Sequence, residues 1–266
     1  MSLVHLNFCS KYLNGNTDVN IILPSMNPFG SPSFEEICET KEYPVLWLLH
    51  GTFSDYSSWV RQTNIERYAN EAGLIVVMPD ALNSGYSDWP GFGVGYSMFD
   101  YLTRELMPLV QAWFPVSQKR EDNVIGGFSA GGFGAMKYGF EHPELFRGMI
   151  VLSAPAYDIS KVPLDPASPD YVRAKNEIDN FGDREAFYQS IHNPAYSVRR
   201  YAAGGQDLDL YFAIGRDDFL YDKHLEFEGL AEEVGLKAQI ETFDGYAHDF
   251  KFWDMAIQRG IAHVCK

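Results

Sequence analysis

One serine of the chain stands in a pattern that could turn its hydroxyl into a nucleophile. Ser129 is the third residue of Gly127-Phe128-Ser129-Ala130-Gly131, which follows the apolar pair Val124-Ile125 and precedes a helical pattern. In the G-x-S-x-G motif, a serine occupies the apex of a sharp turn between a strand and a helix. Glycines permit the close approach of strand and helix, and the N-terminus of the helix favours a developing negative charge. The motif therefore predicts that Ser129 attacks an acyl group.

His248 is the preferred base for this serine. A serine hydroxyl is a poor nucleophile until a base removes its proton, and the base needs an acid that orients it. His248 follows the strand-like run 238–243 and opens the last helical pattern of the chain. Among the seven histidines it also satisfies the order Ser, acid, His. His50 lies near the same edge of the predicted sheet but precedes the serine, so we expect it to brace a loop.

Two adjacent aspartates, Asp217 and Asp218, are the candidates for the acid. Both follow the apolar run 210–214. Neighbouring residues in a turn point in different directions, so only one of the two can reach His248. An aspartate at such a place often serves only to form the turn. The residues by themselves leave the choice between the two open.

Attack on a carbonyl creates an oxyanion, which needs two aimed hydrogen-bond donors. One expected donor is the backbone N–H of Ala130, directly after the nucleophile. The loop His50-Gly51-Thr52-Phe53 should supply the other, with the N–H of Thr52 preferred and that of Phe53 as the near alternative. Four aromatic residues are candidates to line the substrate site, although packing in the core is the simpler role for each: Phe53, Tyr56, Trp89 and Phe128.

Continuous apolar runs predict the strands that bring these loops together. Such runs are typical of strands buried on both faces, as in parallel sheets covered by helices. They lie at 45–49, 74–78, 124–125, 149–152 and 210–214. Helical patterns alternate with them. We therefore expect an α/β fold with a mostly parallel central sheet, helices on both faces, and ligands bound at the carboxyl ends of the strands.

The sequence also predicts the edge of the sheet and two of the helices. Residues 3–8 and 19–23 flank an Asn-Gly-Asn turn and predict an antiparallel hairpin at the N-terminus. Helices are expected over about 57–72 and 96–114. Pro108 should bend the second of them, because proline cannot donate a backbone hydrogen bond.

The chain is expected to form a single domain over residues 1–266, since it is long enough to bury one large core. Residues 24–42 hold three prolines and many polar groups and are predicted to form a loop. Prolines also interrupt residues 155–207, where no strong apolar periodicity appears. This segment is predicted to be a cap-like insertion over the strand ends, with short helices around 170–180 and 184–191.

Composition narrows the classes of partner. The net charge of −15 argues against binding to nucleic acids or to anionic membranes. No apolar run approaches the ~18 residues of a membrane span and no signal peptide is visible, so we expect a cytoplasmic protein. Cys9, Cys38 and Cys265 show no metal-ligand spacing and are expected to be free thiols. A homo-oligomer is compatible with this composition.

Taken together, these motifs resemble the esterase D-like branch of the α/β-hydrolases, and within it the small tributyrin-esterase and feruloyl-esterase-like proteins. The matching pieces lie between about 44 and 254: Leu48-Leu49-His50-Gly51 with Trp59, Val77-Met78-Pro79-Asp80, Gly127-Phe128-Ser129-Ala130-Gly131-Gly132, Asp218-Phe219-Leu220, and His248-Asp249-Phe250 with Trp253. The resemblance implies an α/β-hydrolase fold and a serine carboxylesterase that needs neither metal nor cofactor. It also implies that Asp218 is the acid, because the family's acid stands directly before a Phe-Leu-like pair.

Members of this family hydrolyse short acyl esters, acetylated or feruloylated sugars, or S-formylglutathione. The S-formylglutathione hydrolases are the less similar group, since their loop is typically Ser-Gly-Leu-Thr-Cys where this chain has His50-Gly51-Thr52-Phe53. The expected activity is hydrolysis of a small-molecule, short-chain ester. The alternatives are a thioesterase of the S-formylglutathione hydrolase type, an acyltransferase on the same triad, and a non-catalytic binding protein. The complete set of Ser, Asp and His argues against the last.

Overall fold

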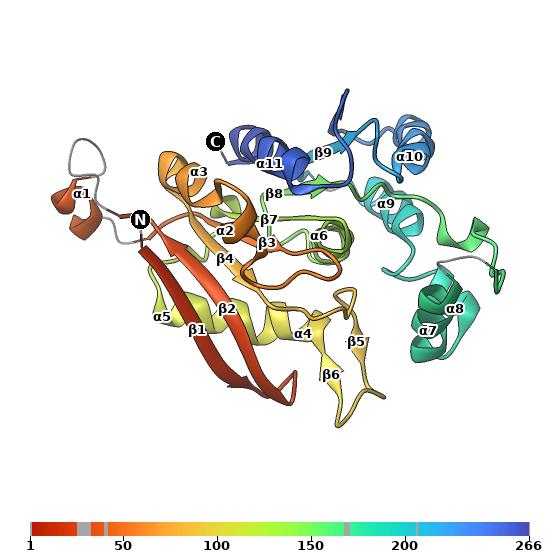
Figure 1. Ribbon diagram of the computed structural model, residues 1–266, viewed down its shortest axis with the longest axis horizontal. Coiled ribbons are helices and arrows are strands. Elements are labelled where there is room, and N and C mark those ends of the chain that lie inside the picture. The colour runs from red at the N-terminus through yellow and green to blue at the C-terminus, as the bar shows by residue number, and fades with distance from the viewer. Residues whose placement is uncertain (1, 26–32, 40–41, 168–170, 206, 266) are drawn as a thin grey trace.

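The computed structural model describes residues 2–25, 33–39, 42–167, 171–205 and 207–265. An eight-stranded sheet forms the centre of this part of the chain (Figure 1). Its strand order is β1-β2-β4-β3-β7-β8-β9-β10. β1 and β2 pair antiparallel, as do β2 and β4, while the pairs from β4 to β10 are parallel. The predicted α/β fold with its N-terminal hairpin is confirmed. The strands span Ser2–Ser10 (β1), Gly15–Leu23 (β2), Val45–Leu49 (β3), Ile75–Pro79 (β4), Asn123–Phe128 (β7), Gly148–Leu152 (β8), Asp209–Gly215 (β9) and Gln239–Phe243 (β10).

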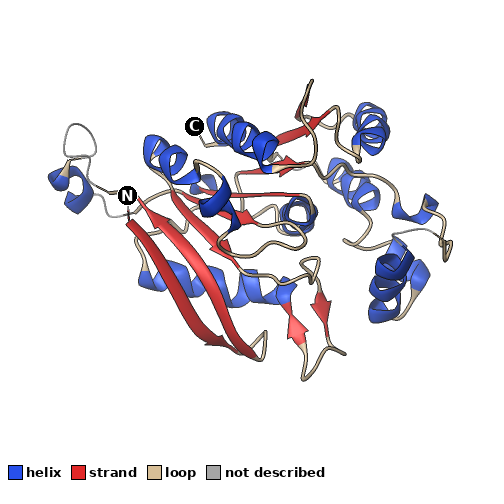
Figure 2. Cartoon of the chain, viewed as in Figure 1, coloured by secondary structure: helices blue, strands red, loops and turns tan. Residues whose placement is uncertain are grey.

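Alternate side chains of each central strand enter different cores. In β3, Val45, Trp47 and Leu49 join the core on one face of the sheet, whereas Leu46 and Leu48 join the core on the other. Because both faces are buried, the strand is apolar without alternation. Helices cover both faces (Figure 2). On the Leu46 face lie α2 (Ser58–Gln62), α3 (Ile65–Ala72) and α11 (Phe250–Val264); on the Val45 face lie α4 (Met98–Tyr101), α5 (Met107–Trp113), α6 (Ala130–Glu141), α9 (Pro194–Ala203) and α10 (Tyr221–Val234).

The helix predicted over 96–114 contains a widened turn. A π-helical segment, Leu102–Leu106, joins α4 to α5. Pro108 has no N–H to donate to the preceding turn, and its ring crowds the carbonyl there, which favours a wider turn just before it. The structure therefore has a π segment where the sequence predicts a bend.

A short helix, α1 (Phe34–Glu39), lies inside the predicted loop 24–42. A capping box closes its first turn, because the N–H of Ser33 donates to the Glu36 carboxylate (2.5 Å) and the N–H of Glu36 donates to Ser33 Oγ (3.2 Å). The loop prediction is therefore wrong for these residues, although their Ser-x-x-Glu spacing was visible in the sequence. Residues 26–32 and 40–41 of the predicted loop lie outside the described chain.

The segment 155–207 divides into two parts. Its second part contains α9, which packs against α6 and α10 and buries Ala195 and Val198 in the core. The first part contains α7 (Tyr171–Phe181) and α8 (Arg184–Tyr188), near the helices predicted from the sequence. There Asn180 Nδ2 donates to the carbonyl of Asp88 at 2.9 Å. The α7–α8 part therefore contacts the short strand β5 (Asp88–Trp89), which pairs antiparallel with β6 (Tyr96–Ser97) in a second, two-stranded sheet. It is for this part that a cap-like role stays a prediction.

Two glycines allow β7, α6 and the end of β3 to meet at backbone distance. A Cβ on Gly127 would stand 2.5 Å from the carbonyl of Gly131 and 2.8 Å from the oxygen of Leu49. A Cβ on Gly131 would stand 2.6 Å from the oxygen of His50 and closer still to that of Leu49. Cβ atoms do not approach backbone this closely without displacing it. Close packing therefore explains both glycines of the G-x-S-x-G motif.

Alanine substitutions in two helices should change stability in opposite directions. Alanine has a higher helix propensity than glycine, so Gly229→Ala in α10, where an added Cβ meets open space, should raise the free energy of unfolding by up to about 1 kcal/mol. Gly131→Ala in α6 should lower the free energy of unfolding by about 1–3 kcal/mol, because the new methyl group would overlap the backbone oxygens of Leu49 and His50. Urea unfolding of both variants tests this, and stabilisation by Gly131→Ala would contradict the packing.

His224 is a buried histidine at the start of α10. It is 2% exposed, and its Nε2 has no hydrogen-bond partner among the described residues, with Glu228 Oε1 3.4 Å away. Burial lowers the pKa of His224 from 6.5 to about 4. The imidazole is therefore neutral in the folded protein above about pH 4, and between about pH 4 and 6.5 the unfolded chain binds a proton here that the folded chain does not.

This difference predicts a loss of stability as the pH falls from about 6.5 toward 4, by up to about 1.4 kcal/mol per pH unit from this group. His224→Phe removes the titration and keeps an apolar ring among Tyr221 and Phe227. Between pH 7 and pH 5 the free energy of unfolding of the wild type should fall by about 2 kcal/mol more than that of the variant. Urea unfolding at several pH values measures this, and parallel curves would show that His224 does not titrate as described.

Candidate active site

Ser129 stands at the junction of β7 and α6 in a strained backbone conformation. Its φ of 53° and ψ of −122° lie outside the regions that L-residues usually adopt. The turn is held from both sides, because the N–H of Ser129 donates to the oxygen of Leu152 (2.9 Å) and the N–H of Phe133 donates to the oxygen of Ser129 (3.0 Å). The structure thus has the sharp strand–turn–helix that the motif predicts.

A chain of hydrogen bonds joins Ser129, His248 and Asp218. His248 Nε2 lies 2.9 Å from Ser129 Oγ, and His248 Nδ1 lies 2.8 Å from Asp218 Oδ2. An ionised carboxylate can only accept, so Nδ1 carries the proton and Nε2 presents its lone pair to the serine hydroxyl. In this arrangement the histidine can take the hydroxyl proton.

The two adjacent aspartates point in different directions. Asp218 has a fully buried side chain, and its second oxygen, Oδ1, accepts from the N–H of Leu220 at 2.9 Å. Asp217 is exposed, and its own N–H donates to the oxygen of Tyr246. The structure therefore places Asp218, and not Asp217, beside His248.

Aromatic rings hold the imidazole of His248. The ring of Phe219 lies 4.5 Å from it, and Trp253 meets it edge-on at 5.1 Å. Trp253 is itself anchored, because its indole N–H donates to Ser153 Oγ (3.0 Å) and its ring stacks on Phe128 at 4.0 Å. Phe219, which is 76% exposed, and Trp253 were not predicted as site residues. The only signal for them in the sequence is that they lie beside the motifs that contain Asp218 and His248.

The loop after β3 is braced by His50, as expected from the sequence. His50 Nε2 accepts the N–H of Ala81 (2.9 Å), so its Nδ1 carries the proton and donates to the oxygen of Gly51 (2.8 Å). The N–H of Phe53 donates to Asn83 Oδ1 (2.9 Å). The N–H of Thr52 has no such partner in the described chain. Of the two predicted loop donors, Thr52 is therefore the one left available for an oxyanion.

Ala130 is the first residue of α6 and so carries one of the N–H groups that a helix leaves unpaired at its start. The helix dipole adds positive potential at this place. That Ala130 and Thr52 together hold the oxyanion stays a prediction.

The four aromatic candidates lie in different surroundings. Phe128 is 1% exposed and packs in the core between Trp59 and Trp253, so the prediction that it lines the substrate site is wrong. Phe128 is the last residue of β7, and because side chains alternate along a strand it points into the same core as Val124. Phe53 is 91% exposed in the loop after β3. Tyr56 stacks on the imidazole of His5 at 5.1 Å, and Trp89 lines a separate cavity.

Two further properties concern the described residues as a whole. They contain no group of three or more His, Cys, Asp or Glu side chains that could hold a metal ion. None of their helices is long and apolar enough to cross a membrane.

Comparisons with known proteins identify the family of this chain. Residues 10–262 match the sequence model of the Esterase family. The acetyl esterase of Caldicellulosiruptor saccharolyticus is 29% identical over 273 residues, which cover 100% of this chain and 99% of the relative.

Solved structures support the same family assignment. Fluorophosphonate-binding serine hydrolase F (FphF) of Staphylococcus aureus, with substrate bound, is 30% identical, with a TM-score of 0.80 over 100% of this chain and 98% of that chain. The S-formylglutathione hydrolase FrmB of the same organism is also 30% identical, with a TM-score of 0.80 over 100% and 99% of the two chains. A ferulic acid esterase is 25% identical, with a TM-score of 0.73 over 99% and 97%. The chain therefore belongs to the Esterase family, has the α/β-hydrolase fold, and is a carboxylic ester hydrolase.

Proposed function

We propose that the protein is a serine carboxylesterase that hydrolyses short-chain acyl esters with Ser129, His248 and Asp218 as its catalytic triad. The observation that carries the proposal is the unbroken chain of contacts from Ser129 Oγ through His248 to Asp218, with distances of 2.9 Å and 2.8 Å. The acetyl esterase relative, which matches this chain over nearly its full length, supports a short acyl group.

In the first half of the reaction, Ser129 Oγ attacks the ester carbonyl while His248 Nε2 takes the hydroxyl proton. Asp218 holds the imidazole in the correct tautomer and stabilises its protonated form. The carbonyl oxygen becomes an oxyanion and accepts hydrogen bonds from the N–H groups of Ala130 and Thr52. The intermediate then collapses, the bond to the alcohol oxygen breaks, and His248 gives its proton to the departing alcohol.

In the second half, water repeats the role of the serine. His248 takes a proton from water, whose oxygen attacks the acyl-enzyme carbonyl, and the same two N–H groups hold the new oxyanion. Collapse breaks the bond to Ser129 Oγ, which regains its proton from His248. The products are the free acid and the alcohol, and the enzyme returns to its starting state.

A thioesterase of the S-formylglutathione hydrolase type is the second candidate. The 30% identity to the FrmB structure favours it, since the same triad can cleave a thioester by the same steps. The sequence of the loop at His50 favours the oxygen ester. An ester panel of increasing acyl length, with S-formylglutathione included, separates the two by their kcat/KM values.

Ser129→Ala should abolish hydrolysis of p-nitrophenyl acetate, because no other hydroxyl adjoins His248 Nε2 in the described chain. The rate constant should fall by about 10⁴-fold or more. Ser160→Ala, which removes a surface hydroxyl, is the matched control and should retain full activity. A Ser129→Ala variant that is folded by circular dichroism and still active would show that another group is the nucleophile.

The two adjacent aspartates allow a matched test of the acid. Asp218→Asn keeps the shape of the side chain but offers His248 an amide that favours the wrong tautomer, so kcat should fall by about 10³–10⁴-fold. Asp217→Asn alters only an exposed side chain and should leave kcat within about twofold. Steady-state kinetics of both variants decides the assignment, which the opposite ranking would overturn.

A further inference from the structure

One peptide group in the loop after β3 has its carbonyl held and its N–H left available. Gly51 and Thr52 share this group, and its carbonyl oxygen accepts from His50 Nδ1 at 2.8 Å. In a trans peptide the C=O and the N–H point in opposite directions. The N–H of Thr52 therefore points away from the buried imidazole of His50, and it has no hydrogen-bond partner in the described chain. The bond to the Gly51 carbonyl thus sets the direction of the proposed oxyanion donor.

The peptide groups on both sides of this one are held by the loop that joins β4 to β5, residues 80–87. On one side, the hydroxyl of Tyr86 donates to the oxygen of His50 at 2.8 Å. On the other side, Asn83 Oδ1 accepts the N–H of Phe53 at 2.9 Å. Tyr86 is 1% exposed, so its bond lies in the core, whereas Asn83 is exposed. One neighbouring loop therefore fixes the loop after β3 at both ends.

Phe53 needs this support because its backbone is strained. Thr52 and Phe53 are the central residues of a turn, which the N–H of Ser54 closes on the oxygen of Gly51 at 3.3 Å. The φ of Phe53 is 62°, in the left-handed region that favours glycine at the third position of a turn. Another residue keeps such a conformation only where its surroundings hold it. Rotation of the peptide group between Thr52 and Phe53 would relieve the strain, and the hydrogen bond to Asn83 opposes that rotation.

The loop can hold Phe53 because its own backbone is anchored next to Asn83. The indole N–H of Trp89 donates to the oxygen of Ser84 at 2.7 Å. The ammonium of Lys137, which is buried on α6, donates to the oxygen of Gly85 at 2.7 Å. Because Ser84 and Gly85 directly follow Asn83 in the chain, these two bonds limit the movement of its backbone as well.

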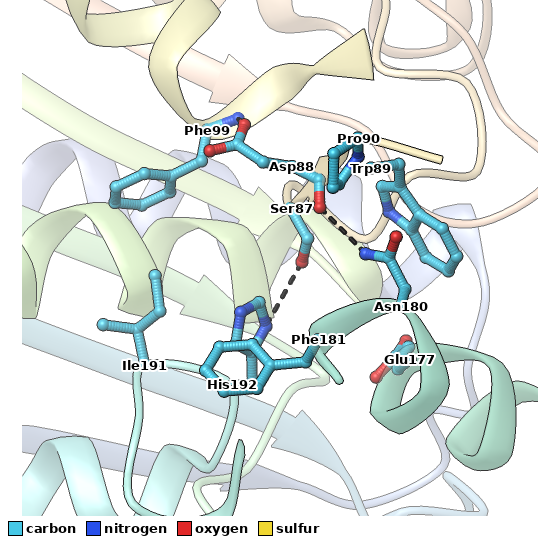
Figure 3. A pocket seen from close by; sticks show the side chains of 10 residues that line it. All are labelled: Ser87, Asp88, Trp89, Pro90, Phe99, Glu177, Asn180, Phe181, Ile191 and His192. Atoms are coloured by element: carbon cyan, nitrogen blue, oxygen red, sulfur yellow. Dashed lines mark hydrogen bonds between the residues drawn. The ribbon is translucent and has the colours of Figure 1, made fainter. Parts of the chain in front are cut away.

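The segment that carries α7 holds the far end of the same loop. Trp89 and Asn180 both line a cavity of about 270 Å³, where the amide of Asn180 donates to the oxygen of Asp88 at 2.9 Å (Figure 3). Ser87 Oγ and His192 Nδ1 form a second contact, 3.3 Å long, between residues that line this cavity. The loop is therefore held by α7 at one end and contacts the loop after β3 at the other.

We propose that Asn83 is a positioning residue, which keeps the N–H of Thr52 directed at the oxyanion. It acts through the backbone, because it holds the peptide group that follows Thr52 and with it the turn to which Thr52 belongs. A donor that is fixed before the reaction loses no free energy to reorganisation when the oxyanion forms. Without Asn83 the strained turn relaxes, and the donor is out of line for part of the time. The proposal rests on the proposed esterase function, in which Thr52 supplies a donor.

Steady-state kinetics of Asn83→Ala with p-nitrophenyl acetate tests this role. The oxyanion exists only after the attack, so a misplaced donor should lower kcat by about tenfold and leave KM within about twofold. Asn16→Ala, which removes an exposed amide from β2, is the matched control and should leave both constants within about twofold. Equal kcat values for the two variants, or an effect of Asn83→Ala on KM alone, would overturn the proposal.

The strain at Phe53 supplies a second, independent test. Glycine adopts a positive φ readily, so in Phe53→Gly the turn no longer needs Asn83. Adding Asn83→Ala to Phe53→Gly should therefore lower kcat by less than about twofold, against about tenfold in the wild-type background. A loss of about tenfold in both backgrounds would show that Asn83 does not act through this turn, and would overturn the proposal. Failure of the esterase function would look different, as activity that survives Ser129→Ala.

Discussion

The close contact of β7, α6 and the end of β3 is the constraint on which the rest of the site depends. At Gly127 and Gly131 the backbones stand where no side chain fits, and the chain must therefore turn sharply at Ser129. The turn has two consequences. It places the serine hydroxyl beside His248, and it leaves the N–H of Ala130 unpaired at the start of α6. One packing contact thus sets the positions of the proposed nucleophile and of one proposed oxyanion donor.

The other half of the proposed triad depends on burial. Asp218 has no solvent contact at its side chain, and its two oxygens are divided between the imidazole of His248 and a backbone N–H. A buried carboxylate needs such partners, since an unpaired charge in the interior is costly. The imidazole is in turn packed between Phe219 and Trp253. The histidine therefore has little freedom to leave its position between acid and serine.

Much of this architecture could be predicted from the sequence, because the signals were local. Buried strands of a parallel sheet are apolar throughout, and the glycines around Ser129 mark a close approach. The choice between Asp217 and Asp218 was not local. It depends on which side chain the turn directs inward, and that follows from backbone bonds to distant residues such as Tyr246. For the same reason Phe128, next to the nucleophile, could be placed in the core only by its contacts with Trp253.

The cavity at Trp89 and the packing of α9 in the core could not be predicted from the sequence either. Both arise where segments far apart in the chain pack together: α9 against α6 and α10, and α7 against β5. The segment 155–207 shows no strong periodicity because its helices are short. Among its described helices, α9 joins the large core with Ala195 and Val198, whereas the buried Ile178 of α7 and Phe187 of α8 lie outside that core. Its packing partners, rather than its own pattern, determine its structure.

The most direct test of the central claim is covalent labelling with a fluorophosphonate, followed by mass spectrometry of the peptides. The hydrogen-bonded chain activates one hydroxyl only, so the adduct should appear on Ser129 and its formation should be lost in His248→Ala. An adduct on another residue, or labelling of His248→Ala at the rate of the wild type, would show that this chain of contacts is not what makes the serine reactive.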